Sequence, residues 1–430
     1  MTNVRRTVLS LLLAEEERDG FANLLLSDAV VARAGEDAAR LTALFYGTVE
    51  RRLTLDYAIG TLASREPSSL TPHTRNLLRL GLYQIYFSRI PVHAAVDETV
   101  SLGEGRGERS LVNAVLRRAA KTPLPLPPEG RRARHMSVKH AFPLSTVRHF
   151  ISLYGEEETE ELLSAFNRVA PLTVTVNFSK TTPDALLALW EKNGIRAERT
   201  AYSSRALRLA ESLPPERLPG FAEGYFLVQD EASALCAECL GARAGETVID
   251  VCSAPGGKIL SAATAIKGEG RFYAFDLHES KLSLIRASGA RLGVLPDTRA
   301  VDATVGEPTL FGCADRVICD VPCSGLGVLG KKPDLRYREH SETLAPLGLA
   351  ILTASTRYLK EGGTLVYSTC TLSPDENEEN VRRFLSENES FEPVDFAFGA
   401  GLSSRDGMLT LLPHKHGTDG FFMAKLKKIK

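Results

Sequence analysis

The sequence predicts a modular α/β protein in which a doubly wound parallel sheet follows an all-α unit and a small α+β unit. From about residue 225 onward, apolar β-type runs alternate with helical stretches, which is the pattern of successive βαβ units. The first 120 residues instead repeat apolar side chains three and four positions apart, as amphipathic helices do. The 430-residue length fits this division, because domains average roughly 150 residues.

Composition changes along the chain predict the boundaries. Helical periodicity supports a first domain over residues 1–125, and a segment rich in proline and arginine predicts a linker over 126–134. Helical and β-rich runs mixed over 135–222 predict a small α+β domain, and 223–430 form the last domain. In that last domain we expect strands at 247–252, 271–276, 316–320 and 363–369.

Overall composition is that of a soluble globular protein, with 43% hydrophobic and 24% charged residues and a net charge of -1. The apolar run 8–14 leads directly into three glutamates, which favours an amphipathic helix over a signal peptide and predicts a cytoplasmic protein without a membrane partner. All seven cysteines lie beyond residue 235, and an odd number in such a chain predicts reduced thiols rather than a disulfide framework.

Basic residues gather near the end of the helical region. Residues 101–140 contain nine Lys or Arg and three acidic side chains, Glu104, Glu108 and Glu129. Such a segment can bind phosphates of a nucleic acid. A solvated helix end followed by a linker explains the same charges, and the sequence leaves both interpretations open.

A first candidate site is the segment 250–258, Asp-Val-Cys-Ser-Ala-Pro-Gly-Gly-Lys, where an apolar strand should end and a helix begin. Small residues at Cys252, Ala254 and Gly256 let a backbone approach a nucleotide-like ligand closely. Asp276, at the end of the next strand, lies about 20 residues beyond the loop, the spacing expected of a carboxylate that binds ribose hydroxyls. A plain tight turn is the alternative interpretation.

A second candidate site combines Asp320 and Cys323, after one predicted strand, with Cys370, after the next. Open α/β sheets bind ligands at the carboxyl ends of their strands, so both thiols should reach one crevice if these strands are neighbours. The alternatives are a metal pair or buried filler residues. We predict no metal site, because Cys236 and Cys239 lie in an apolar helical run without a second ligand pair.

These motifs together resemble the RNA cytosine-5 methyltransferases. The resemblance rests on the loop at 253–258, on Asp-Val-Pro-Cys-Ser-Gly at 320–325 with Lys-Pro-Asp-Leu-Arg-Tyr at 332–337, on Tyr-Ser-Thr-Cys at 367–370 with Pro-Asp-Glu-Asn at 374–377, and on Asp-Gly-Phe-Phe at 419–422. Val-Gln-Asp-Glu-Ala-Ser at 228–233 matches the segment before their catalytic domain. Upstream, the motifs at 46–49, 81–84, 90–95 and 111–117 resemble a NusB-type RNA-binding domain.

The resemblance implies a Rossmann-like class I methyltransferase domain, an RRM-like middle domain, and a specific cytosine of 16S rRNA, bare or partly assembled, as the substrate of a monomer. It implies S-adenosyl-L-methionine as the cofactor. It makes Cys370 the nucleophile, with Cys323 and Asp320 as further catalytic residues. The implied cofactor-binding residues are Cys252, Ser253, Ala254, Pro255, Gly256, Gly257, Lys258, Asp276, Asp302 and Asp320.

Two positions depart from the family pattern. Ile259 stands where a threonine usually follows the loop lysine, and Thr175 stands where an arginine usually lies two residues before an asparagine. Two other functions remain as alternatives. One is a methyltransferase of the same fold acting on an exocyclic amine or a protein side chain, for which Cys370 is only structural. The other is an RNA-binding module with an inactive transferase attached.

Overall fold

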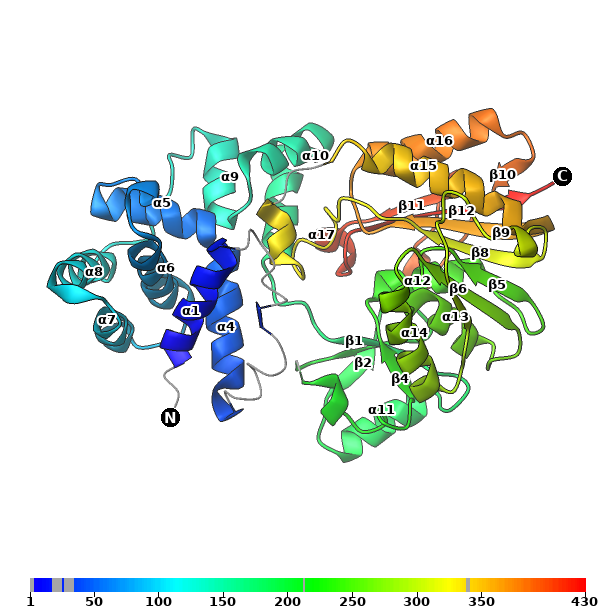
Figure 1. The fold of residues 1–430 in the computed structure, drawn as a ribbon, viewed down its shortest axis with the longest axis horizontal. Helices are drawn as coiled ribbons and strands as arrows, with labels where there is room; N and C mark the ends of the chain where they lie inside the picture. The colour runs from blue at the N-terminus through cyan, green and yellow to red at the C-terminus, as the bar shows by residue number, and fades with distance from the viewer. Residues whose placement is uncertain (1–3, 18–24, 27–34, 212, 338–340) are drawn as a thin grey trace. The chain divides into compact units, whose positions relative to one another are not determined.

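The computed structural model describes residues 4–17, 25–26, 35–211, 213–337 and 341–430 (Figure 1). The chain forms two compact units. Unit 1 contains Met1–Arg168 together with Leu329–Glu339, and unit 2 contains Val169–Val328 and His340–Lys430. The chain therefore leaves unit 2 at residue 329 and returns to it eleven residues later. The last domain was predicted as one continuous range, 223–430, and this excursion interrupts it.

Unit 1 is helical, as its apolar periodicity predicts. On α4, for example, Leu41, Leu44 and Phe45 share one face and are buried in the core. Its α-helices are α1 Val4–Glu17, α4 Ala38–Glu50, α5 Arg52–Ala63, α6 Pro72–Phe87, α7 Val92–Ser101, α8 Gly105–Ala119, α9 Arg132–His140 and α10 Leu144–Phe166. Helix α9 begins inside the segment predicted to be a linker, and α10 is interrupted at Gly155, which has a non-helical φ of 79°.

Segment 329–337, which leaves unit 2, packs within unit 1 and contains the short helix η5, Pro333–Tyr337. Arg336 is only 2% exposed and donates to the Leu329 carbonyl and to Asn167 Oδ1, at 2.9 and 3.0 Å. The Tyr337 hydroxyl donates to the carbonyl of Glu50, at 3.0 Å. A buried guanidinium is stable only with such partners, so this segment is an integral part of the helical unit.

Unit 2 begins with a small antiparallel sheet of order β2-β3-β1-β4. Its strands are β1 Thr173–Val176, β2 Ala197–Arg199, β3 Ala206–Leu209 and β4 Phe226–Val228. Helix α11, Pro183–Lys192, covers one face and contributes Trp190, which is fully buried beside Phe226. This is the α+β fold predicted for the middle of the chain, but the predicted range 135–222 is wrong at its start, because residues 135–168 are helical and pack in unit 1.

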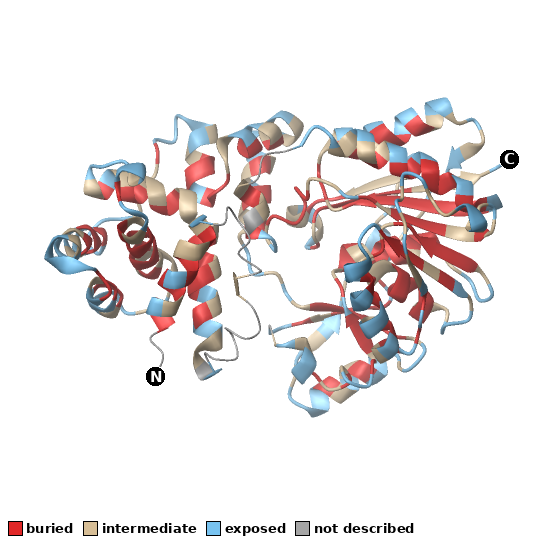
Figure 2. Cartoon of the chain, in the orientation of Figure 1, coloured by how far each residue is buried: buried red, intermediate tan, exposed pale blue. Residues whose placement is uncertain are grey.

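The larger sheet has eight strands, in the order β10-β12-β9-β8-β5-β6-β7, with β11 beside β12. Five of these strands run parallel: β5 Thr247–Asp250, β6 Arg271–Asp276, β7 Asp297–Ala300, β8 Ala314–Asp320 and β9 Leu359–Thr369. The antiparallel part consists of β10 Phe391–Pro393, β11 Met408–Leu411 and β12 Phe421–Lys428. The central strands of the larger sheet are buried almost throughout (Figure 2).

Helices cover both faces of this sheet, which makes the fold doubly wound and Rossmann-like (Figure 1). Helices α12 Glu231–Leu240, α13 Gly257–Ala265 and α14 Glu279–Leu292 pack on one face, and α15 Leu344–Ser355 and α16 Glu378–Glu387 on the other. Neighbouring strand residues point to opposite faces, so Ile318 packs with the first helix group and Val317 with the second.

The small domain and the Rossmann-like domain are joined by buried hydrogen bonds within unit 2. Arg205, 3% exposed, donates to the Ser261 carbonyl and to Thr264 Oγ1 on α13, both at 2.9 Å. Asn177 Nδ2 donates to the Leu292 carbonyl at 2.8 Å. Losing such a buried partner costs roughly 1–3 kcal/mol, so these contacts hold the small sheet against the domain that carries the candidate site. Among the described helices, none is long and apolar enough to span a membrane.

Candidate active site

The carboxyl ends of the five parallel strands form the edge at which the predicted site residues meet. Asp250 ends β5, Asp276 ends β6 and Asp320 ends β8, while Asp302 and Cys370 follow β7 and β9. Strand β5 lies between β6 and β8, so the connections leaving β5 and β8 diverge from the middle of the sheet. Ligands of open α/β sheets bind at this switch point.

The loop between β5 and α13 is shaped for close approach of a ligand. Gly256 has a φ of +101°, and a Cβ there would lie 3.1 Å from Ile285, so only glycine fits without strain. The Gly256 amide donates to the Ser253 carbonyl at 2.6 Å, and the Ser253 amide to the Phe275 carbonyl at 2.7 Å. Helix α13 then begins at Gly257, so its free amides face the same crevice, as a nucleotide-type ligand requires.

Asp320 ends β8 at this edge, and both of its carboxylate oxygens are engaged. Lys258 Nζ lies 2.7 Å from Oδ2, and the Ser368 hydroxyl donates to Oδ1 at 2.7 Å. Burial alone would lower the pKa of Lys258, but Asp320, Cys236 and Asp250 raise it above its ordinary value. Lys258 therefore stays charged, and its positive charge balances the negative charge of Asp320.

Asp250 ends the neighbouring strand β5 and is 1% exposed. Burial and the nearby Asp320 raise its pKa to about 7, against the opposing effect of Lys258. Sequence reasoning assigned Asp250 no role. The structure makes it a buried acid that titrates near neutral pH, directly behind the loop 251–256.

We expect the Asp250 carboxyl to make unfolding pH-dependent. Its folded pKa is raised, so its stabilising contribution is complete below pH 3.8, the ordinary value, and is lost as pH rises through about 7. The loss amounts to at most about 1.4 kcal/mol per pH unit. Denaturant unfolding measured from pH 5 to 8 should show this decline in the wild type, and Asp250→Asn should flatten it. An unchanged slope in the variant would contradict this assignment.

Cys323 and Cys370 come together as predicted, with 3.4 Å between their sulfur atoms. They follow β8 and β9, which pair in parallel. The hydrogen bond to Cys370 and burial both raise the pKa of Cys323. Cys236 and Cys239 are buried in the hydrophobic core of α12, in agreement with their structural interpretation.

The two remaining predicted aspartates differ in their environment. Asp276 is 8% exposed, accepts from the His278 amide at 3.0 Å, and lies 3.7 Å from Lys281 Nζ. Asp302 is solvent-exposed, and hydrogen bonds from the Thr304 hydroxyl and amide lower its pKa. Asp276 thus offers a sheltered acceptor, whereas Asp302 lies at the outer rim.

A second polar network was not predicted. Glu376 accepts from the amide and the hydroxyl of Ser324, at 2.9 and 2.6 Å. Asn377 Oδ1 accepts from the Thr369 hydroxyl at 2.6 Å, and its Nδ2 donates to the Thr371 carbonyl at 3.0 Å. The motif at 374–377 follows Cys370 closely in the sequence, and this pointed to a role for Glu376 and Asn377 near the site. The spacing of the motif does not show which side chains these two residues bind.

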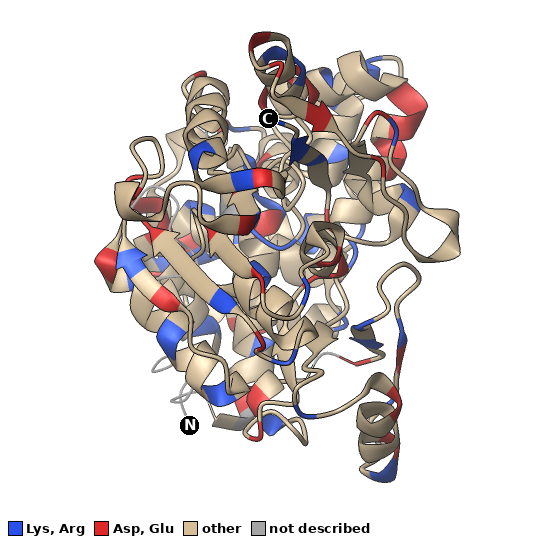
Figure 3. Cartoon of the chain, turned by 90° about the vertical axis from the view of Figure 1, so that its right-hand side faces the viewer, with Lys and Arg blue, Asp and Glu red and all other residues tan. Residues whose placement is uncertain are grey.

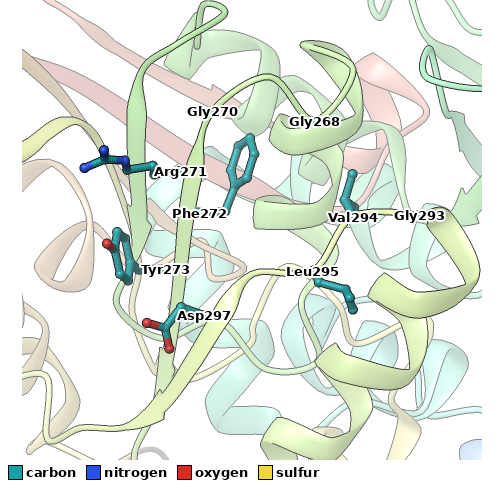
Figure 4. Close-up of a pocket in the computed structure, with 9 residues that line it drawn as sticks. All are labelled: Gly268, Gly270, Arg271, Phe272, Tyr273, Gly293, Val294, Leu295 and Asp297. Carbon is teal, nitrogen blue, oxygen red and sulfur yellow. The ribbon is translucent and has the colours of Figure 1, made fainter.

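A pocket of about 360 Å³ lies at the opposite edge of the sheet, where β6 and β7 begin (Figure 4). It is lined by Gly268, Gly270, Arg271, Phe272, Tyr273, Gly293, Val294, Leu295 and Asp297. None of the predicted site residues lines it, and it contains no pair of nucleophile and base. This pocket is therefore separate from the predicted site residues at the carboxyl edge.

Comparison with known proteins covers every part of the chain. The family model for 16S rRNA methyltransferase RsmB/F matches residues 237–427, that for the NusB family matches 2–121, and that for the ferredoxin-like domain of RsmF/B-like methyltransferases matches 142–215. The ribosomal RNA small subunit methyltransferase B of Pseudomonas putida is 34% identical and aligns with 90% of this chain and 89% of its own. The chain belongs to this methyltransferase family.

Two further proteins extend the likeness. The Synechocystis sp. protein named probable ribosomal RNA small subunit methyltransferase B is 34% identical over 100% of both chains. The crystal structure of a methyltransferase homolog protein from Pyrococcus horikoshii is 28% identical, with a TM-score of 0.59, and covers 68% of this chain and 97% of that one. The all-α, ferredoxin-like and Rossmann-like order predicted from the motifs is therefore confirmed.

The two departures from the family pattern are accommodated inside the fold. Ile259 is fully buried in the core beneath α13, where an aliphatic side chain adds apolar contact. Thr175 is also fully buried, and its hydroxyl donates to Gln229 Oε1 at 2.9 Å.

Proposed function

We propose that this protein transfers a methyl group from S-adenosyl-L-methionine to C5 of a specific cytosine in 16S rRNA, through a covalent bond between Cys370 and C6 of the base. The observation that supports this most strongly is the meeting of two thiols beside Asp320, at the carboxyl edge of the sheet. A methyltransferase acting on an amine needs no nucleophile, whereas C5 of cytosine becomes nucleophilic only after addition at C6.

Cys370 carries the covalent step. Its thiolate adds to C6, and the electron pair of the 5,6 double bond moves toward C5 as N3 takes up a proton. S-adenosyl-L-methionine supplies, when bound, an electrophilic methyl group to which C5 bonds. Loss of the C5 proton to a base then restores the double bond and breaks the bond between C6 and the sulfur, which frees Cys370.

Asp320 and Cys323 have supporting roles in this proposal. Asp320 holds the base edge and relays toward N3 a proton supplied by Lys258, which donates to its Oδ2, while Ser368 fixes the other oxygen. Cys323, 3.4 Å from Cys370, assists release of the methylated product. The hydrogen bond to Cys370 and burial raise the pKa of Cys323, which favours its thiol form.

The residues around the β5 loop fit the cofactor. The loop from Cys252 to Lys258 brings backbone amides and the helix N-terminus to one side of the crevice. Asp276 provides the sheltered carboxylate for the ribose hydroxyls, and Asp302 lies at the rim where a purine ring would reach solvent.

The proposed substrate is RNA of the small ribosomal subunit, and we propose that the protein acts on it in the cytoplasm as a monomer. The support is the names of the relatives and the NusB-type domain. The test is methylation of bare and ribosome-assembled 16S rRNA with labelled cofactor, followed by mapping of the modified nucleotide. Label at C5 of one cytosine is the expected result, and label on an exocyclic amine would overturn the proposal.

The basic residues at the end of α8 and in α9 should contribute RNA affinity. Lys and Arg lie interspersed with Asp and Glu in the view of Figure 3. In the sequence, Arg117, Lys121 and Arg134 are exposed in a region with few acids. Replacing all three by Gln should lower the slope of log affinity against log salt by roughly 0.7 to 0.9 for each phosphate that the protein no longer neutralises. Filter binding across a salt series measures this slope.

The matched control replaces Arg382 and Arg383, which are equally exposed on α16. Its slope should stay at the wild-type value. Removal of the whole N-terminal domain is a poorer test, because segment 329–337 packs within unit 1 and would lose its partners. An equal slope in the triple variant and the wild type would assign the helical domain another role.

A further inference from the structure

The loop that carries Cys323 has no regular secondary structure of its own. It follows β8, and residues 321–325 form neither helix nor strand. A flexible loop cannot hold a thiol at a fixed distance from a second loop, because each unconstrained residue gains about 1–2 kcal/mol of backbone entropy when it is released. Fixed bonds from elsewhere must therefore hold Cys323 near Cys370.

Glu376 provides such bonds. One of its carboxylate oxygens accepts from the Ser324 amide at 2.9 Å and the other from the Ser324 hydroxyl at 2.6 Å. The Ser324 oxygen also lies 2.6 Å from Thr371 Oγ1. Since the Ser324 proton goes to the carboxylate, the Thr371 hydroxyl donates to Ser324. The carboxylate thus holds Ser324, the residue after Cys323, and the Ser324 hydroxyl in turn accepts from Thr371, the residue after Cys370.

The carboxylate itself is held rigidly. Glu376 is 7% exposed and ends the short helix η7, Pro374–Glu376. Its carbonyl accepts from the hydroxyl of Tyr367, a fully buried residue of β9, at 2.6 Å. The chain of bonds therefore runs from the sheet core through Glu376 to both cysteine loops. Two charge-assisted hydrogen bonds to one residue are stronger and more directional than neutral ones.

We propose that Glu376 is the positioning residue that holds Cys323 and Cys370 together, acting through Ser324 and Thr371. This inference rests on the proposed function, because only a covalent mechanism needs both thiols at one base. Without the carboxylate, Cys323 should move away from the adduct formed by Cys370. Release of the product should then be slowed more than binding of RNA.

Three variants and one matched control test the positioning role. Glu376→Ala removes both acceptors, whereas Glu376→Gln keeps one acceptor and the shape. Ser324→Ala keeps the amide bond to Glu376 but removes the hydroxyl that bridges to Thr371. Asp375→Ala is the control, because Asp375 is exposed and has the same charge on the same short helix. Thermal unfolding curves of all variants are measured first, and the assays are then run at a temperature at which every variant is folded.

The first readout needs neither RNA nor cofactor. Dibromobimane links two thiols that lie close together, and mass spectrometry identifies the peptide pair containing Cys323 and Cys370. We expect linking at the wild-type rate in Asp375→Ala, slightly slower linking in Glu376→Gln, and linking slowed by about tenfold or more in Glu376→Ala and Ser324→Ala. Should Glu376→Ala fail to fold, Ser324→Ala and Glu376→Gln decide the question.

The second readout is the covalent RNA adduct, resolved on denaturing gels with Cys323→Ala as the reference. We expect Glu376→Ala and Ser324→Ala to accumulate the retarded band and to lose kcat by about tenfold or more, with KM little changed. If Cys323→Ala traps RNA but both variants link and turn over like Asp375→Ala, the positioning role is wrong and the proposed function stands. If Cys323→Ala traps nothing and the label is not at C5, the proposed function fails, and the linking rate alone decides the role of Glu376.

Discussion

Replacing Cys370 by Ala should abolish both methyl transfer and any covalent complex with RNA, whereas replacing Cys323 by Ala should leave RNA attached to the protein. The two thiols lie 3.4 Å apart in one crevice and are similar in size, so their opposite phenotypes come from the reaction and not from packing. In the proposed mechanism Cys370 is the group that bonds to C6, so its replacement removes the attacking thiolate. Denaturing gels with labelled RNA and cofactor distinguish the two cases.

The double variant is the control for this experiment, and it should behave like Cys370→Ala because release cannot matter where attack never occurs. A retarded band in Cys370→Ala would mean that nucleophile and release group have been exchanged. Full activity in both single variants would exclude the covalent mechanism altogether. Cys319→Ala, a change in the buried core below the site, reports any general effect of losing a thiol on stability.

Asp276→Ala should weaken binding of S-adenosyl-L-methionine at least about tenfold. Asp276 ends β6, is 8% exposed, and faces the crevice beside the loop that begins α13. A sheltered carboxylate that accepts from two ribose hydroxyls makes charge-assisted hydrogen bonds worth roughly 1.5–3 kcal/mol, and 1.4 kcal/mol corresponds to a factor of ten. Isothermal titration calorimetry measures the affinity directly.

Asp297→Ala is the matched control, because this exposed carboxylate lies at the amino end of the neighbouring strand β7. Its affinity for the cofactor should equal that of the wild type. Thermal unfolding without ligand separates a binding defect from a folding defect, since Asp276 also accepts from the His278 amide. Unchanged calorimetric affinity in Asp276→Ala would remove Asp276 from the proposed site.

Strands with strong local signals were predicted accurately, and those without them were missed. β6 matches its predicted range, and β8 and β9 begin only two and four residues earlier than predicted. β7, Asp297–Ala300, was not predicted, because its residues are half-exposed and lack an apolar run. The antiparallel strands β10 to β12 were also missed. β10 pairs with β12, and β12 with β9, over long sequence separations, whereas β11 pairs with β12 over a short one.

The sequence by itself determined the domain order, the β5 loop and the two cysteines, because apolar periodicity, glycine requirements and the residues at strand ends are local properties of the chain. Only the tertiary structure decided which strands are neighbours, and hence that Cys323 and Cys370 meet. It alone showed that Lys258 neutralises Asp320, that Glu376 joins both cysteine loops, and that residues 329–337 pack with the helical unit. Hydrogen bonds between side chains distant in sequence depend on packing geometry, which no local pattern encodes.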